Sequence, residues 1–153
     1  MNPSEKISQL GIKLPSPPSA AGLYKPALIN GELLYFSGHL PIKDDGTMIT
    51  GKIGEELTIE EGRDAARLVG LNILASAKQV LGSLDRVRSV VKLLGMVNAT
   101  EDFIQHPQII NGCSELFSEI WGDDYGVGVR SAFGVSGLPA GVPVEIEGVL
   151  KIA

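Results

Sequence analysis

Residues 58–81, TIEEGRDAARLVGLNILASAKQVL, carry the pattern that decides the fold. Thr58, followed three positions later by Glu61, forms a capping box, which predicts the start of a helix. We therefore expect a helix from Thr58 to about Leu81. One side of this helix is an apolar stripe made of Ala65, Ala66, Val69, Ile73, Ala77, Val80 and Leu81. Charged residues cover the opposite side, so the apolar face should pack on a sheet.

The segment before this helix predicts strands. Asn30-Gly31 separates two apolar runs, and this is a strong hairpin signal because both residue types tolerate a positive φ. The strands are expected at about 25–29 and 33–38. A turn at 44–46 (DDG) then leads to a third short strand at 48–52.

The segment after the helix supplies the rest of the sheet and a second helix. β-branched and aliphatic residues favour a strand buried on both sides around Val90 to Leu94. Pro107 is a favoured first helical position, and an apolar face follows it. The expected elements are a strand at 86–97, a helix from Pro107 to Gly122, and strands at 129–135 and 144–152.

This order, β-β-β-α-β-α-β-β, predicts an α+β fold in which both helices cover one face of a mixed sheet. Strand residues of both parities are apolar, for example Leu33, Leu34, Tyr35 and Phe36. The second sheet face must therefore be covered as well, and we expect other subunits to cover it.

The first 22 residues are interpreted as an arm. Ser4 to Leu10 favours a short helix capped by Ser4 and closed at Gly11, and the proline-rich run 14–18 favours an extended path. Residues 23–153 are then expected to form one domain.

Composition limits the classes of function. The chain has 153 residues, 44% of them hydrophobic and 20% charged, which is typical of one globular domain. The net charge of −5, with scattered basic residues, makes nucleic acid an unfavourable partner. One cysteine and two histidines supply no metal-ligand cluster and favour a reducing compartment. With neither a signal peptide nor a membrane span evident, we expect a cytoplasmic protein.

Arg130 is the strongest candidate for ligand binding. It stands at the mouth of a strand beside Gly126 and Gly128, where missing side chains let a ligand or another backbone approach. The planar guanidinium can bind a carboxylate through two parallel hydrogen bonds. A solvated arginine at a strand end is the alternative that the residues leave open.

Glu145 and Glu147 alternate with Val144 and Ile146, so the two carboxylates share one face of the last strand. A solvent-facing strand explains this pattern too. A carboxylate beside a bound substrate would instead move protons for an attacking water.

Other polar residues have simpler interpretations. Cys113 lies on an apolar helix face and is expected to be an inert core thiol. His106 is expected to help cap its helix, and His39 either lines the cleft or satisfies a local hydrogen bond. Asp123 and Asp124 are interpreted as a solvated loop.

The residues of RSAFGVSGLPAGVPVEIE (130–147), with LLYFSGHLP (33–41) and VNATEDF (97–103), resemble the Rid family of reactive-intermediate imine deaminases. This family is also called the YjgF or L-PSP endoribonuclease family. The resemblance runs from about Tyr24 to Ala153. It implies a chorismate-mutase-like subunit, a homotrimer, and sites in the clefts between subunits.

The resemblance also implies roles for individual residues. Arg130 falls on the carboxylate-binding arginine, and Glu145 on the acid that orients the hydrolytic water. Tyr24, Gly38 and Asn111 match residues that line the cleft. Backbone groups near Gly38 and Ala132 would fix the substrate, and no metal or organic cofactor is implied.

The chain departs from the best-characterised deaminases at several positions. Ala132 stands where those proteins often carry cysteine, and His39 stands where glutamine is common. The N-terminal arm and a longer 43–57 segment are typical of a divergent long-form branch.

Three functions follow as hypotheses. The first is hydrolysis of small 2-imino acids or enamines to 2-keto acids and ammonia. The second is a trimer that binds a small carboxylate-bearing metabolite without reaction, and the third is ribonuclease activity. The acidic charge and few aromatic residues offer little for RNA to bind.

Overall fold

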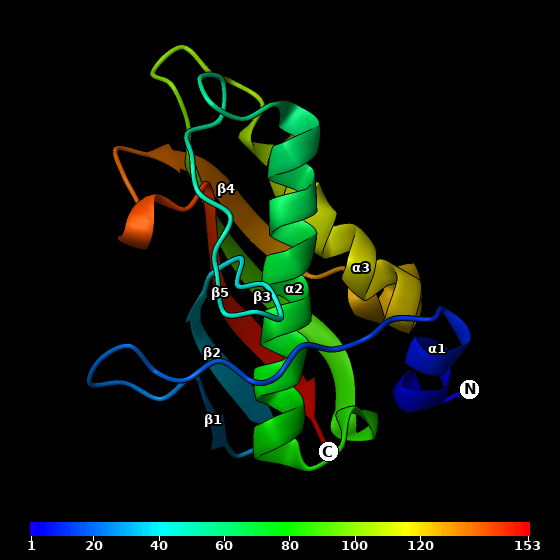
Figure 1. The fold of residues 1–153 in the computed structure, drawn as a ribbon. Helices are drawn as coiled ribbons and strands as arrows, with labels where there is room; N and C mark the ends of the chain where they lie inside the picture. Colours follow the sequence, from blue (N-terminus) through cyan, green and yellow to red (C-terminus); the bar gives the residue numbers. More distant parts are fainter.

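The computed structural model describes all 153 residues as one layer of helices on one sheet (Figure 1). The helices are α1 (Pro3–Gln9), α2 (Ile59–Leu81) and α3 (His106–Gly126), with single 3-10 turns η1 (Leu84–Arg86) and η2 (Pro139–Gly141). The strands are β1 (Ala27–Asn30), β2 (Leu33–His39), β3 (Val87–Asn98), β4 (Val129–Val135) and β5 (Val144–Ile152).

The five strands form a mixed sheet in the order β1-β2-β5-β3-β4. Only β3 and β4 pair in parallel, and the other neighbours are antiparallel. α2 packs on β2 and β5, α3 packs on β3 and β4, and the two helices lie against each other on the same face. The predicted α+β arrangement is confirmed.

α2 begins as its sequence predicts. The Thr58 hydroxyl accepts a hydrogen bond from the Glu61 amide, and the Glu61 carboxylate accepts one from the Thr58 amide. Ala65, Val69 and Ile73 are completely buried in a core that also contains residues of α3 and of the sheet. This core holds the helical layer at a fixed position over the strands.

The predicted hairpin forms, but its turn lies one residue later than the Asn30-Gly31 pair suggests. Asn30 pairs with Leu33 and belongs to the strand, so the central turn residues are Gly31 and Glu32. Only Gly31 takes a positive φ, at 63°. Glycine at the first central position with positive φ is the requirement of a type II′ turn.

The third strand predicted at 48–52 is wrong. The backbone there pairs with turns and loops: Ile49 N–H donates to the carbonyl of Pro41, and Gly51 N–H donates to that of Gly141. Isolated bridges join Ile42 to Met48, and Ile53 to Leu57 and Ala99. The residue types favour a strand, but no sheet edge lies beside this segment to pair with it.

The N-terminal arm packs on the helices. The cap of α1 is Asn2 and not Ser4, because the Asn2 side chain accepts from the Glu5 amide and the Glu5 carboxylate accepts in return. The Ser4 amide instead donates to Asp85, and Ile7 joins the core. The chain then crosses the outer surface of α2 and ends in a loop that projects beside β1 and β2 (Figure 1).

The sheet face opposite the helices is open in the single chain. Residues with large apolar side chains there include Leu28, Tyr35, Val91, Val129 and Phe133, each more than a third exposed. Burial of β3 on both sides is therefore not found within one chain. The residues are apolar on both faces, as the sequence indicates, but one chain covers only one face.

No helix in the structure has both the length and the apolar character that a bilayer crossing requires.

Candidate functional site

Arg130 lies on β4, the edge strand of the sheet, and points toward α3. Its register partner Leu93 is buried, and paired residues present their side chains to the same sheet face. The Arg130 Nη1 donates to Ser114 Oγ at 3.0 Å, and Nη2 donates to the Pro107 carbonyl oxygen at 3.3 Å. These two bonds orient the guanidinium and leave further N–H donors for a ligand.

A cavity of about 410 Å³ opens beside this guanidinium, between α3, the middle of β3 and the start of β4. Asn111, which the resemblance placed near the ligand, lines the same cavity. The full lining is Leu93, Asn111, Ser114, Glu115, Ser118, Asp123, Gly126, Val127, Gly128 and Arg130. One chain therefore brings Arg130 and Asn111 to one concave surface.

The glycines before Arg130 are required by backbone packing. A Cβ atom added to Gly128 would lie 2.6 Å from the carbonyl oxygens of Val90 and Val91, and one added to Gly126 would overlap the backbone of Phe117. Gly122 breaks the helical path of α3 with a φ of 74°. The sequence left open whether a ligand or another backbone approaches these glycines. Close approach of another backbone explains both positions.

Glu145 lies half-buried on β5, with its side chain over Gly38 of β2. A Cβ atom at position 38 would overlap the Glu145 carboxylate, so glycine is needed there. Burial raises the pKa of the Glu145 carboxyl above its usual value, and the negative charge of Glu147 raises it further. A carboxyl with a raised pKa is better suited to accept and return a proton near neutral pH.

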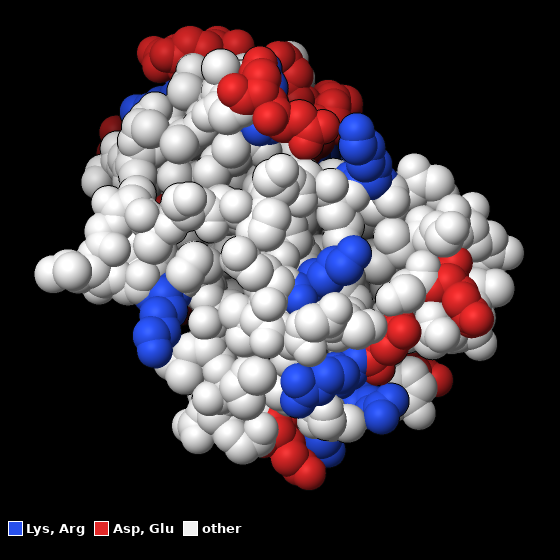
Figure 2. Space-filling view, turned by 60° about the horizontal axis from the view of Figure 1, so that its bottom comes forward, with Lys and Arg blue, Asp and Glu red and all other residues white.

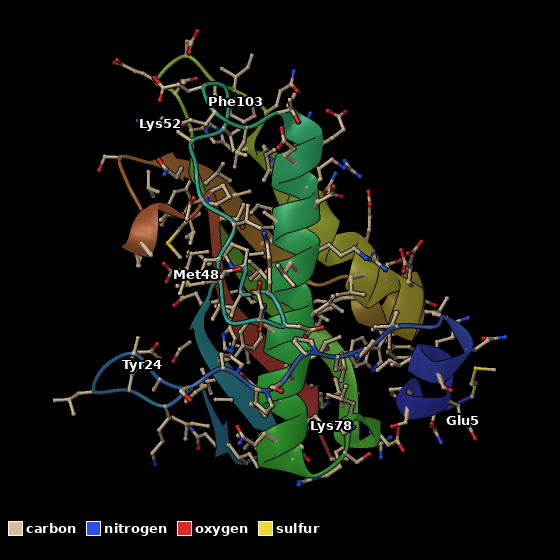
Figure 3. All side chains as sticks on the ribbon, viewed as in Figure 1. Glu5, Tyr24, Met48, Lys52, Lys78 and Phe103 are labelled. Atoms are coloured by element: carbon tan, nitrogen blue, oxygen red, sulfur yellow. The ribbon has the colours of Figure 1, made fainter.

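Tyr24 lies on the projecting loop (Figure 3), near Gly38 of β2. Tyr24, Gly38 and Met48 line one small cavity of about 80 Å³. The Tyr24 hydroxyl accepts a hydrogen bond from the Ala21 amide, which closes the loop on itself. Tyr24 and Gly38 thus lie on the β2 side of the molecule, far along the sheet order from β4.

Arg130 and Glu145 lie on opposite faces of the sheet. Arg130 pairs with Leu93 on the helix-covered face, whereas Glu145 pairs with Met96. Met96 stands between Gly95 and Val97, whose positions face the helices, so Met96 and Glu145 face the open side. One chain therefore does not bring the Arg130 guanidinium and the Glu145 carboxylate together.

Ala132 lies on the same side of β4 as Arg130 and packs against the core. Because β4 is an edge strand, only one of its sides is paired, with β3. The backbone near Ala132 is available to a ligand or to another chain along the unpaired side.

The remaining candidates have structural roles. His39 is buried, with its ring nitrogens 2.6 Å from the Ser37 carbonyl oxygen and 2.7 Å from Ser76 Oγ, and burial lowers its pKa. His106 makes an edge contact with Phe103, and no side-chain bond caps α3. Cys113 is completely buried, and burial raises its thiol pKa, as expected for an inert thiol.

Sequence reasoning missed several polar residues of the Arg130 cavity. Ser114, Glu115 and Ser118 continue from Asn111 at helical spacing, and this polar stripe was visible in the sequence. Asp123, interpreted as part of a solvated loop, lines the cavity and accepts a hydrogen bond from the Ser118 hydroxyl. The sequence places the end of the helix at Gly122, but the structure shows only a break in the helical path there, after which α3 continues through Asp123 to Gly126.

Charged side chains form no continuous basic surface on the face shown in Figure 2, where basic and acidic residues are mixed and acidic ones gather along one edge. No group of three or more His, Cys, Asp or Glu side chains is placed to hold a metal ion.

The fold and the arginine cavity define an α+β protein of the chorismate-mutase-like class. A family model described as "YjgF/chorismate mutase-like, putative endoribonuclease" matches residues 4–139, and the chain belongs to this YjgF/Rid family. Protein TCP17 of Trypanosoma cruzi is 38% identical over 95% of this chain and 91% of its own length.

Solved structures agree with this assignment. A protein of unknown function from Agrobacterium tumefaciens is 35% identical, with a TM-score of 0.88 over 99% of this chain and 94% of that one. A putative endoribonuclease from Shewanella oneidensis is 30% identical, with a TM-score of 0.93 over 99% and 100% of the two chains. RidA from an Antarctic Psychrobacter is 28% identical, with a TM-score of 0.62 over 90% and 94%.

Proposed function

We propose that this protein hydrolyses small 2-imino acids, or the related enamines, to 2-keto acids and ammonia in clefts between the subunits of a homotrimer. The observation that carries the proposal is the oriented Arg130 guanidinium at the mouth of a polar cavity. A carboxylate bound there would form charge-assisted hydrogen bonds, each contributing about 1.5–3 kcal/mol.

The trimer is part of the proposal because one chain carries the two halves of the site, Arg130 and Glu145, on opposite faces of its sheet. Arg130 and Asn111 would form one wall of a cleft, and Glu145, Gly38 and Tyr24 of a neighbouring copy would form the other. The open apolar sheet face supports this arrangement, since an exposed apolar surface of this kind is typical of an interface between subunits.

The reaction needs one water molecule and one proton carrier. The substrate carboxylate binds Arg130, and the protonated imine carbon is already electrophilic. Glu145 accepts a proton as the water oxygen bonds to that carbon, giving a carbinolamine. Glu145 then returns the proton to the nitrogen, the C–N bond breaks to release ammonia, and the ammonia takes the hydroxyl proton, which leaves a 2-keto acid and ammonium.

The test couples an amino-acid oxidase or dehydratase, which releases 2-imino acids, to this protein and follows imine decay. The wild type should accelerate decay, and Arg130→Gln should reduce the acceleration at least tenfold with a raised KM. Arg67→Gln is the matched control, because Arg67 is held by a surface ion pair with Glu119 at 3.0 Å. Decay no faster than in buffer, with folded protein, would refute the activity.

A carboxylate-binding protein without turnover is the second candidate. The separation of Glu145 from Arg130 favours it, since the binding half of the site needs only one chain. Calorimetry showing Arg130-dependent binding of a 2-keto acid, with no imine turnover, would select this candidate. RNA cleavage that survives stringent purification and disappears in Arg130→Gln would select the ribonuclease activity that the family's name suggests.

A further inference from the structure

Two carboxylates share the cavity with Arg130. Glu115 comes from α3, one turn after Asn111, and Asp123 comes from the segment that follows the break at Gly122. Carboxylates that lie close to a bound anion weaken its binding, because like charges repel. Their presence therefore needs an explanation in terms of the ligand.

The charges in this cavity are not balanced once a carboxylate binds. Glu115 is compensated, since its Oε1 lies 2.6 Å from Nη2 of Arg63. Asp123 has only the neutral Ser118 hydroxyl as a hydrogen-bond partner. With Arg130 neutralised by the ligand carboxylate, the exposed Asp123 is the carboxylate of the lining that has no basic side chain paired with it.

The cavity is also larger than the smallest imino acids need. Its volume of about 410 Å³ equals roughly 14 water volumes of about 30 Å³ each. An imino acid with three carbons has six non-hydrogen atoms, so the space extends well beyond its carboxylate and imine. Ser118 and Asp123 line the same space as Arg130.

We propose that the Arg130 cavity selects carboxylates that carry a cationic group at the far end of the chain, with Arg130 binding the carboxylate and Asp123 the cation. On the proposed function, this makes imines derived from basic amino acids the preferred substrates. The inference rests on that function for its site and adds a role for Asp123.

The test compares two ligands of equal chain length, 5-aminopentanoate and pentanoate, by calorimetry on the full protein. The wild type should bind 5-aminopentanoate about fivefold more tightly, and the preference should shrink in 0.5 M salt because exposed charges are screened. Asp123→Asn keeps an oxygen for Ser118 and removes the charge, so it should abolish the preference without weakening pentanoate binding. Asp124→Asn, an exposed neighbour outside the cavity lining, is the matched control.

The outcomes separate this inference from the function on which it rests. Arg130-dependent binding of both ligands with equal affinity would overturn the cationic selectivity alone. Absence of binding for both ligands would overturn the carboxylate clamp, and the selectivity with it. A preference that persists in Asp123→Asn would also overturn the role of Asp123.

Discussion

The two faces of the sheet differ in how they are completed. On the covered face, α2 and α3 bury a continuous core, and the cavity with Arg130 lies at its rim. On the open face, apolar side chains and the half-buried Glu145 have no covering layer from the same chain. The chain therefore completes one layer contact by itself, and in the proposed trimer other copies would complete the second.

The same comparison explains why the candidate residues divide into two groups. Alternation along a strand sends neighbouring side chains to opposite faces, so one sheet can supply an arginine to one side and a carboxylate to the other. Three copies around an axis would then repeat a cleft in which an Arg130 wall meets a Glu145 wall. On the proposed function, this arrangement would make activity depend on assembly.

The largest expected effect comes from matched phenylalanines on the two faces. Phe117 is completely buried and makes an edge contact with Trp121, whereas Phe133 is 42% exposed on the open face. Phe117→Ala should lower the free energy of unfolding by about 3–5 kcal/mol at every protein concentration. On the proposed trimer, Phe133→Ala should destabilise the protein at concentrations at which the wild-type chains assemble, and the loss should vanish at concentrations low enough to dissociate both proteins.

Denaturant titrations over a range of protein concentrations check this difference, with sedimentation measuring the oligomer. If both variants lose the same free energy of unfolding at every protein concentration, the open face is not an interface.

A smaller effect is expected when two inactive variants are mixed. Arg130→Gln and Glu145→Gln each remove one wall of the proposed cleft, so each protein alone should be nearly inactive. In trimers assembled from an equal mixture, about a quarter of clefts should combine an intact Arg130 with an intact Glu145 from its neighbour. Imine decay in the co-refolded mixture should reach about a quarter of the wild-type rate.

Mixing the two variants without refolding provides the control, and this mixture should show no recovery while each trimer keeps its own subunits. No recovery after verified co-assembly would place Arg130 and Glu145 outside a shared cleft.

The elements with local signals were predictable from the sequence. The capping box at Thr58 and the glycine of the hairpin act within a few residues, and both formed, although the turn was placed one residue too early. The segment 48–52 could not be assigned correctly, because strand formation requires a neighbouring edge that the sequence does not reveal. Residues 48–52 form part of a loop instead.

The site was only partly predictable for a similar reason. Arg130 and Asn111 were recognised from motifs, and the structure places them at one cavity. Asp123 was missed because the helix was expected to end at Gly122, whereas α3 continues after a break in its helical path there. The separation of Arg130 from Glu145 required the strand register, which sets the face that each residue occupies.

The smallest expected effect concerns the pH dependence of the open-face carboxylate. As a base, Glu145 must be ionised, so kcat/KM should fall as the pH drops through its raised pKa. Glu147→Gln removes one of the two causes of that rise, the neighbouring negative charge, while burial remains. The acid limb of the profile should therefore move to lower pH.

Glu32→Gln, an exposed change in the hairpin turn, should leave the limb where it is. A limb that stays in place in Glu147→Gln, or moves to higher pH, would assign the titration to a group other than Glu145. Since the shift requires Glu145 to act beside Glu147 in the working cleft, it would tie the open face to the chemistry directly.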